Sequence, residues 1–162
     1  MNIHYAIKVE MLYSNQQMLE ITGETKPRIQ YWVLKGLFQP VDQGKGVGTS
    51  RRYSEGNLLE ILVIQAITQN LPNVDFAKSI LAEIRRTNPS FFSQLGDRED
   101  SIDKADCILT VLFESVNAIM VYVHDFEDAT VCDRTYLSLG LRVYRMDLNF
   151  LKNTLRERIK SI

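Results

Sequence analysis

A short basic segment, residues 26–52, holds the residues best suited to bind a charged partner. It contains six Lys or Arg residues and a single acid, Asp42, which gives it a net charge of +5. It ends in the pair Arg51 and Arg52, which follow a loop with glycines at positions 44, 46 and 48. Guanidinium groups pair well with phosphate oxygens, and glycine lets a backbone come close to phosphate groups. The chemistry that these residues suit is phosphate binding.

Other residue groups lack the spacing that their chemistry would need. The glycines at 44–48 are not preceded by a strand or followed by the Lys-Ser/Thr ending of a nucleotide-binding loop. The acidic segment 124–133 lacks the ligand spacing of a metal site, so a solvated turn is favoured. Cys107 and Cys132 are too few for a disulfide framework and are not spaced as zinc ligands. No nucleophile pattern is present, so we expect no enzyme, no metal and no cofactor.

Two short helices are predicted to position the basic side chains. Ser14 is a good N-cap for a helix that runs to about Thr22, and Gly23 ends it. Thr25 can cap a second helix, in which Pro27 is tolerated in the first turn. A helix, a tight turn, a second helix and a loop with paired arginines form the pattern of a winged helix-turn-helix. Such a fold lays one helix in the major groove of DNA while the wing, here Gly44–Tyr53, contacts phosphates.

The second helix has two distinct faces. At about 100° per residue, Ile29, Trp32 and Val33 share an apolar face that is expected to dock on the first helix. The opposite face carries polar and basic side chains. The residues that we expect to bind DNA, from this helix and from the wing, are Lys26, Arg28, Gln30, Tyr31, Lys35, Lys45, Arg51, Arg52 and Tyr53.

The same residues resemble a known family. The run Thr22-Gly-Glu-Thr-Lys-Pro-Arg-Ile-Gln-Tyr-Trp32, with Gly36-Leu37, Pro40 and Arg51-Arg-Tyr-Ser54 after it, is similar to the DNA-binding domain of MerR-type regulators. The resemblance covers about 70 of the 162 residues. It implies a transcriptional regulator that binds an inverted repeat as a homodimer and distorts the promoter DNA.

The sequence departs from the family in three places. Gln30 stands where the family has Arg, and Val33 stands where it has Glu. The long helix that dimerises MerR-type proteins is not expected here, because Asn88-Pro89 interrupts the chain.

Composition agrees with a globular regulator. Hydrophobic residues make up 45% and charged residues 24% of the chain, whose net charge is −1. Residues 1–86 sum to +2 and residues 87–162 to −3, so the basic patch is local, which favours a regulator over a nonspecific coat protein. No apolar run reaches the ~18 residues of a membrane span, and the start lacks a signal peptide, so we expect no membrane partner and a cytoplasmic protein.

The remaining chain predicts an α+β protein in four parts. Residues 1–12 alternate as a strand or arm, 13–87 form the winged helix-turn-helix, 88–105 are a linker, and 106–162 form a β-β-β-α module. We expect three or four antiparallel strands, within 107–113, 118–123, 129–132 and 136–144, with a bulge at Gly140. The final helix, 147–162, has an apolar seam formed by Leu148, Leu151, Leu155, Ile159 and Ile162.

The second module is expected to dimerise the protein or to bind a small-molecule or protein effector. The seam and a strand edge joined by the arm are both candidate dimer surfaces, and the seam could also pack on its own sheet. Two other functions fit the sequence. One is an excisionase-like protein that bends DNA, and the other is a protein-interaction adaptor built on a winged helix.

Overall fold

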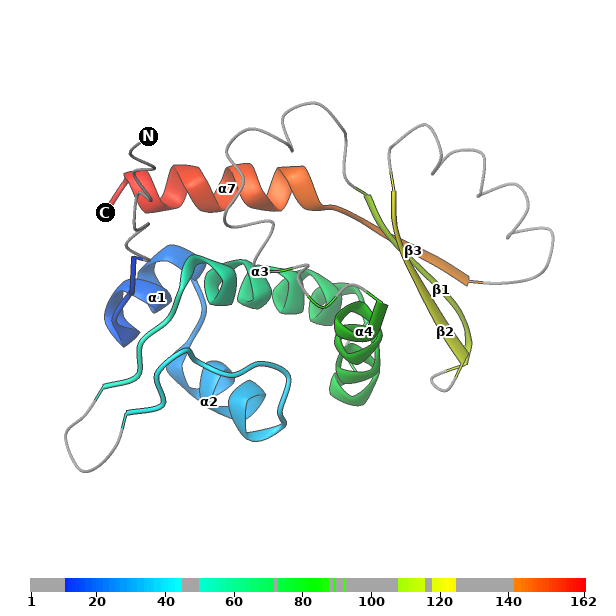
Figure 1. Cartoon of the computed structure of the whole chain (residues 1–162), viewed down its shortest axis with the longest axis horizontal. Coiled ribbons are helices and arrows are strands. Elements are labelled where there is room, and N and C mark those ends of the chain that lie inside the picture. Colours follow the sequence, from blue (N-terminus) through cyan, green and yellow to red (C-terminus); the bar gives the residue numbers. More distant parts are fainter. Residues whose placement is uncertain are drawn as a thin grey trace, which may run out of the picture.

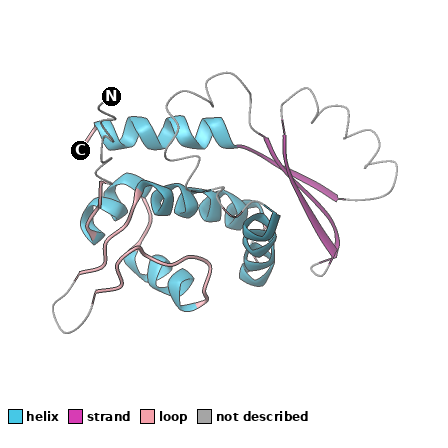
Figure 2. Ribbon diagram, viewed as in Figure 1, coloured by secondary structure: helices cyan, strands magenta, loops and turns pink. Residues whose placement is uncertain are grey.

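The computed structural model describes residues 11–44, 50–71, 73–87, 89, 92, 108–115, 118–124 and 142–162. The elements, in chain order, are α1 (Asn15–Thr22), α2 (Lys26–Leu34), α3 (Glu55–Asn70), α4 (Val74–Thr87), β1 (Ile108–Ser115), β2 (Ala118–His124), β3 (Arg142–Asp147) and α7 (Leu148–Lys160) (Figure 1). Four helices, a small antiparallel sheet and a C-terminal helix confirm the predicted α+β class (Figure 2). Most of the predicted arm and linker, the predicted strand 129–132 and the bulge at Gly140 lie outside the described residues.

The helix starts follow from local capping chemistry. Ser14 Oγ accepts a hydrogen bond from the Gln17 amide at 3.3 Å, and the Gln17 side chain accepts one from the Ser14 amide at 3.0 Å. Ser54 and Asn57 form the same capping box at the start of α3. Gly23 ends α1 with a φ of 67°, in the left-handed region that glycine adopts without strain. The predicted caps at Ser14 and Gly23 are therefore confirmed.

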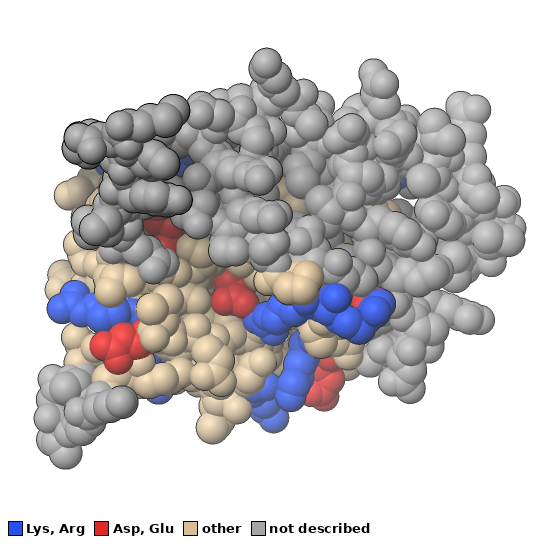
Figure 3. Space-filling view, viewed as in Figure 1, with Lys and Arg blue, Asp and Glu red and all other residues tan. Residues whose placement is uncertain are grey.

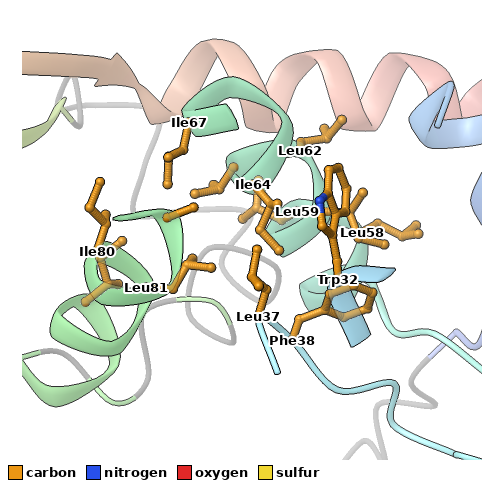
Figure 4. Close-up of a cluster of buried hydrophobic side chains, with 14 of the residues drawn as sticks. Trp32, Leu37, Phe38, Leu58, Leu59, Leu62, Ile64, Ile67, Ile80 and Leu81 are labelled. Atoms are coloured by element: carbon orange, nitrogen blue, oxygen red, sulfur yellow. The ribbon is translucent and has the colours of Figure 1, made fainter. Parts of the chain in front are cut away.

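Helix α3 is the centre of the hydrophobic core. Its side chains are buried on most sides, from Leu58 to Ile67, as expected for a helix that is surrounded by other elements. Figure 4 shows Trp32 and Phe38 on one side of the α3 side chains, and Ile80 and Leu81 of α4 on the other. Burial of a Trp or Phe side chain is worth several kcal/mol, so this core fixes α2 against α3.

The wing is closed at its base by two short antiparallel bridges. Asp42 pairs with Arg52, through amide-to-carbonyl distances of 3.3 and 3.0 Å, and Tyr13 pairs with Tyr53, through distances of 2.8 and 3.0 Å. The second bridge ties Tyr13, two residues before the start of α1, to the last residue of the wing. The tip, residues 45–49, lies outside the described residues.

The sheet has the strand order β2-β1-β3, and both pairs are antiparallel. Its register opposes Leu109 to Val123 on one side and to Met146 on the other. The observed β3, Arg142–Asp147, extends past the predicted strand end at Tyr144, and residues 136–141 lie outside the described part of the chain.

Helix α7 begins where β3 ends and packs along α1 and α3 (Figure 1). Asp147 caps it by accepting a hydrogen bond from the Phe150 amide at 2.9 Å. Leu148 and Leu155 are buried in the same core as Trp32, and Leu151 and Ile159 pack against that core. The predicted amphipathic helix is thus present, but its seam is covered by helices of the same chain. Ile162, placed in the seam by periodicity, is instead exposed.

No helix in the described part of the chain combines the length and the apolar character that a membrane span requires.

Candidate nucleic-acid interface

Helix α2 and the base of the wing border an open groove of about 590 Å³. The groove is lined by side chains from α2, from the segment that leads into the wing and from the wing itself. These residues are Gln30, Val33, Leu34, Gln39, Gln43 and Arg51. Leu34 is 83% exposed, so this large apolar side chain points away from the core.

The buried face of α2 fixes which side chains can reach this groove. Ile29 and Trp32 are buried, as predicted, whereas Val33 is half-buried and both packs against the core and lines the groove. The exposed residues Lys26 and Gln30 remain available to a partner. Both positions that depart from the MerR-type pattern, Gln30 and Val33, line the groove.

Arg28 is exposed, but its guanidinium group already has partners within the chain. Its Nη1 lies 3.3 Å from Glu24 Oε2, and its Nη2 donates a 3.4 Å hydrogen bond to Thr68 Oγ1. The guanidinium carbon also lies 5.0 Å from the centroid of the Trp32 ring, within the range of a cation–π contact. Arg28 therefore helps to hold α2 against α3, a role that its place on the polar face did not reveal.

Glu24 organises the turn between α1 and α2. Its two oxygens accept hydrogen bonds from the Thr25 amide and from Gln65 Nε2, both at 3.0 Å. Gln65 Nε2 also donates to the Thr22 carbonyl at 3.1 Å. Thr25 occupies the N-cap position of α2, but its side chain accepts no capping hydrogen bond. The turn is held by these contacts with α3, which the sequence did not indicate.

Tyr31 of α2 and Lys35 at the C-cap of α2 are exposed, as predicted, and they contact each other. The Lys35 ammonium group is 5.6 Å from the centroid of the Tyr31 ring. Lys45 belongs to the wing tip and lies outside the described residues.

The end of the wing presents its arginines but not its tyrosine. Arg52 is exposed and Arg51 is half-buried at the edge of the groove. Tyr53 has no exposed surface, and its hydroxyl donates a 2.9 Å hydrogen bond to Asn15 Oδ1. Burial raises the pKa of the Tyr53 hydroxyl, and Arg51 lowers that pKa by less. Tyr53 was expected to contact DNA, but alternation along the extended chain turns it into the core, where it holds the wing on α1.

Residues 13–83 match the family model of MerR HTH family regulatory proteins. The N-terminal domain is of the MerR type. The matched segment contains α1, α2, the wing, α3 and most of α4. Proteins with this domain are DNA-binding transcriptional regulators, so the domain is a DNA-binding one. No curated protein matches the sequence.

A polar cluster behind the groove fixes the segment that enters the wing of the MerR-type domain. Asn57 Oδ1 accepts a hydrogen bond from the Val41 amide, and Asn57 Nδ2 donates one to the Gln39 carbonyl, both at 3.0 Å. Asn57, which belongs to the capping box of α3, thus also holds the chain on either side of Pro40.

Arg85 of α4 completes this cluster. Its guanidinium group donates hydrogen bonds to the carboxylate of Glu60 in α3 and to the carbonyl of Leu37, a buried residue in the segment after α2. Burial raises the pKa of the Glu60 carboxyl group, and the Arg85 contacts lower it by less. Through this ion pair α4 supports the segment after α2 in the MerR-type domain.

On the described surface in the view of Figure 3, Lys and Arg side chains lie over the region of α2, α4 and the base of the wing, with a few acidic side chains among them. Within the described part of the chain, no three His, Cys, Asp or Glu residues are grouped so that they could hold a metal ion.

Proposed function

We propose that the protein regulates transcription by recognising a specific sequence of double-stranded DNA, which it binds as a homodimer on an inverted repeat. The observation that carries this proposal is the open groove between α2 and the wing of a MerR-type domain, with Arg51 at its edge. A major groove about 12 Å wide admits an α-helix, so α2 can enter it while the wing follows the sugar–phosphate backbone.

The side chains divide into two sets. Exposed side chains on α2, Gln30 and Tyr31, and Lys35 at its C-cap are proposed to face base edges. Arg51 and Arg52, with Lys26 at the start of α2 and Lys45 in the wing, are proposed to hold phosphates. Arg28 is better placed to position α2, because Glu24 and Thr68 already hold its guanidinium group.

A homodimer is proposed because one winged helix covers only one half-site. Two copies would contact half-sites about 34 Å apart, or a multiple of that distance. The seam of α7 is covered by α1 and α3 of its own chain, which leaves the sheet, with its outer strands β2 and β3, as the dimer surface that we favour. The same C-terminal half would bind a small-molecule or protein effector.

The experiment that tests the proposal measures the salt dependence of DNA binding. Purified protein is titrated onto its own upstream DNA and onto a scrambled duplex, at several salt concentrations, by fluorescence anisotropy. Wild type should prefer the upstream DNA. Replacing both Arg51 and Arg52 with Ala should weaken binding to both duplexes and reduce the slope of log K against log salt by about one to two.

The matched control is Lys160→Ala, which removes an exposed cation from α7 and should leave the slope unchanged. An unchanged slope in the double variant would refute the phosphate assignment. Absence of any duplex binding by wild type would refute the proposed function and favour the interaction adaptor, and binding with bending but no sequence preference would favour the excisionase-like protein.

A further inference from the structure

We propose that α2 reads an A·T base pair through Gln30 and the methyl group of a nearby thymine through Leu34. This inference rests on the proposed function, since it requires α2 to lie in the major groove. It specifies which base pairs the protein prefers within a half-site.

The chemistry of the groove is the first observation. Its lining contains three amide side chains, Gln30, Gln39 and Gln43, and two apolar ones, Val33 and Leu34. Arg51 is the charged residue among the described ones that line it. Gln43 Nε2 donates a 3.0 Å hydrogen bond to Gln39 Oε1, so these two amides bind each other, whereas the exposed amide of Gln30 makes no such contact with the residues that the structure describes.

An amide side chain distinguishes adenine from guanine. It carries one donor and one acceptor, which match the N6 amino group and the N7 atom of adenine in the major groove. Guanine presents two acceptors there, and would leave the amide carbonyl without a partner. Gln30 therefore favours an A·T pair.

The placement of Leu34 supplies the second contact. Gln30 and Leu34 are four residues apart, so they lie one above the other on the same face of α2, about 6 Å apart along its axis. A separation of that size lets the two side chains contact neighbouring positions of one half-site within a major groove about 12 Å wide. A leucine that is 83% exposed offers the apolar surface that the C5-methyl group of thymine contacts.

The state of Arg28 points the same way. An arginine on a recognition helix is the usual reader of guanine, through its O6 and N7 atoms. Arg28 is the arginine of α2, and it is held by Glu24, Thr68 and the Trp32 ring. The arginine that could bind guanine is thus bound within the protein, and the helix presents an amide and an apolar side chain to the groove.

The test uses the full chain. The preferred site is first selected from randomised duplexes, and should contain A·T pairs in both half-sites. Dissociation constants are then measured on duplexes in which single thymines are replaced by uracil, which removes only the methyl group, or single adenines by 7-deazaadenine, which removes only N7. At one thymine and one adenine per half-site, wild type should lose about threefold to tenfold in affinity.

Three variants assign these losses to side chains. Leu34→Ala should no longer lose affinity when thymine is replaced by uracil, but should still lose affinity when adenine is replaced by 7-deazaadenine. Gln30→Ala should still lose affinity with uracil and no longer lose it with 7-deazaadenine. Val41→Ala, which shortens another exposed apolar side chain that does not line the groove, should keep both effects. All three positions have exposed side chains, so the variants are expected to fold.

The outcomes separate the two proposals. If the protein binds no duplex DNA, the proposed function fails and this inference fails with it. If it binds DNA but selects no A·T pair, or if the uracil and 7-deazaadenine effects persist in all variants, the inference alone is overturned. Loss of each effect only in its own variant supports it.

Discussion

The contact between Arg158 and the end of α1 predicts that the last turn of α7 stabilises the helix-turn-helix. Arg158 Nη1 donates hydrogen bonds to the carbonyl oxygens of Ile21 and Thr22, both at 3.1 Å. These carbonyls belong to the last turn of α1, which has no intrahelical donors for them. Arg158→Ala would remove a charged donor from both.

The size of the effect follows from these two contacts. Hydrogen bonds to charged groups contribute about 1.5–3 kcal/mol each. Arg158 is an exposed residue, so solvent weakens both of its hydrogen bonds. Gln65 also still donates to the Thr22 carbonyl at 3.1 Å, so that carbonyl keeps a partner in the variant. We expect Arg158→Ala to lower the free energy of unfolding by about 1–2 kcal/mol in total. For a chain of this size, the melting temperature should fall by about 2–8 °C.

The assay compares thermal unfolding of Arg158→Ala with that of Lys160→Ala. Lys160 is exposed in the same last turn of α7, so its replacement removes the same charge from the helix dipole without removing a contact with α1. Amide hydrogen exchange in α1 should also accelerate in Arg158→Ala and not in the control. Equal melting temperatures and equal exchange in the two variants would refute the reasoning.

Two further predictions concern the same domain. The pKa of Glu60 is raised in the folded state, so this group stabilises the fold below its unfolded pKa of about 4.3, and that contribution is lost as the pH rises through the raised value. Denaturant titrations should therefore show the stability of wild type falling relative to Glu60→Gln as the pH increases; a relative rise would mean that the Arg85 ion pair outweighs burial. Gly23→Ala should lower the free energy of unfolding by about 1–2 kcal/mol, because the φ of Gly23 is 67°. The control is Gly56→Ala within α3, where an added methyl group meets only ordinary contacts of 3.5 Å or more and should not destabilise the fold.

The sequence was informative wherever the structure depends on neighbouring residues. Ser14, Gly23 and Ser54 act within one helical turn of their own position, and each lies at the helix end that its residue type predicts. The periodicity of α2 likewise placed Ile29 and Trp32 in the core. The match of residues 13–83 to the MerR-type model agrees with the motif read from Thr22 to Ser54.

The sequence was less informative wherever a side chain meets a distant segment. Arg28 bonds to Thr68, 40 residues away, and Arg158 bonds to Ile21, 137 residues away, and no periodicity encodes such partners. The same limit applies to Tyr53, whose burial depends on its bridge to Tyr13 and its bond to Asn15. Leu34 was overlooked because an apolar residue in an amphipathic helix is ordinarily assigned to the core.

Contacts within the chain connect the C-terminal half to α2. Asp147 ends β3 and caps α7, so the position of α7 along α1 and α3 follows that of the sheet. At its far end, Arg158 holds the last carbonyls of α1, and the next turn contains Glu24, which binds Arg28 of α2. An effector that bound one position of the sheet more tightly than another would shift the sheet toward that position, and so change how α7 supports the turn between α1 and α2. The free energy available for this shift is the difference between the binding free energies of the effector for the two positions. The proposed effector site would be linked to α2 through α7, because α7 contacts α1, the helix that precedes α2.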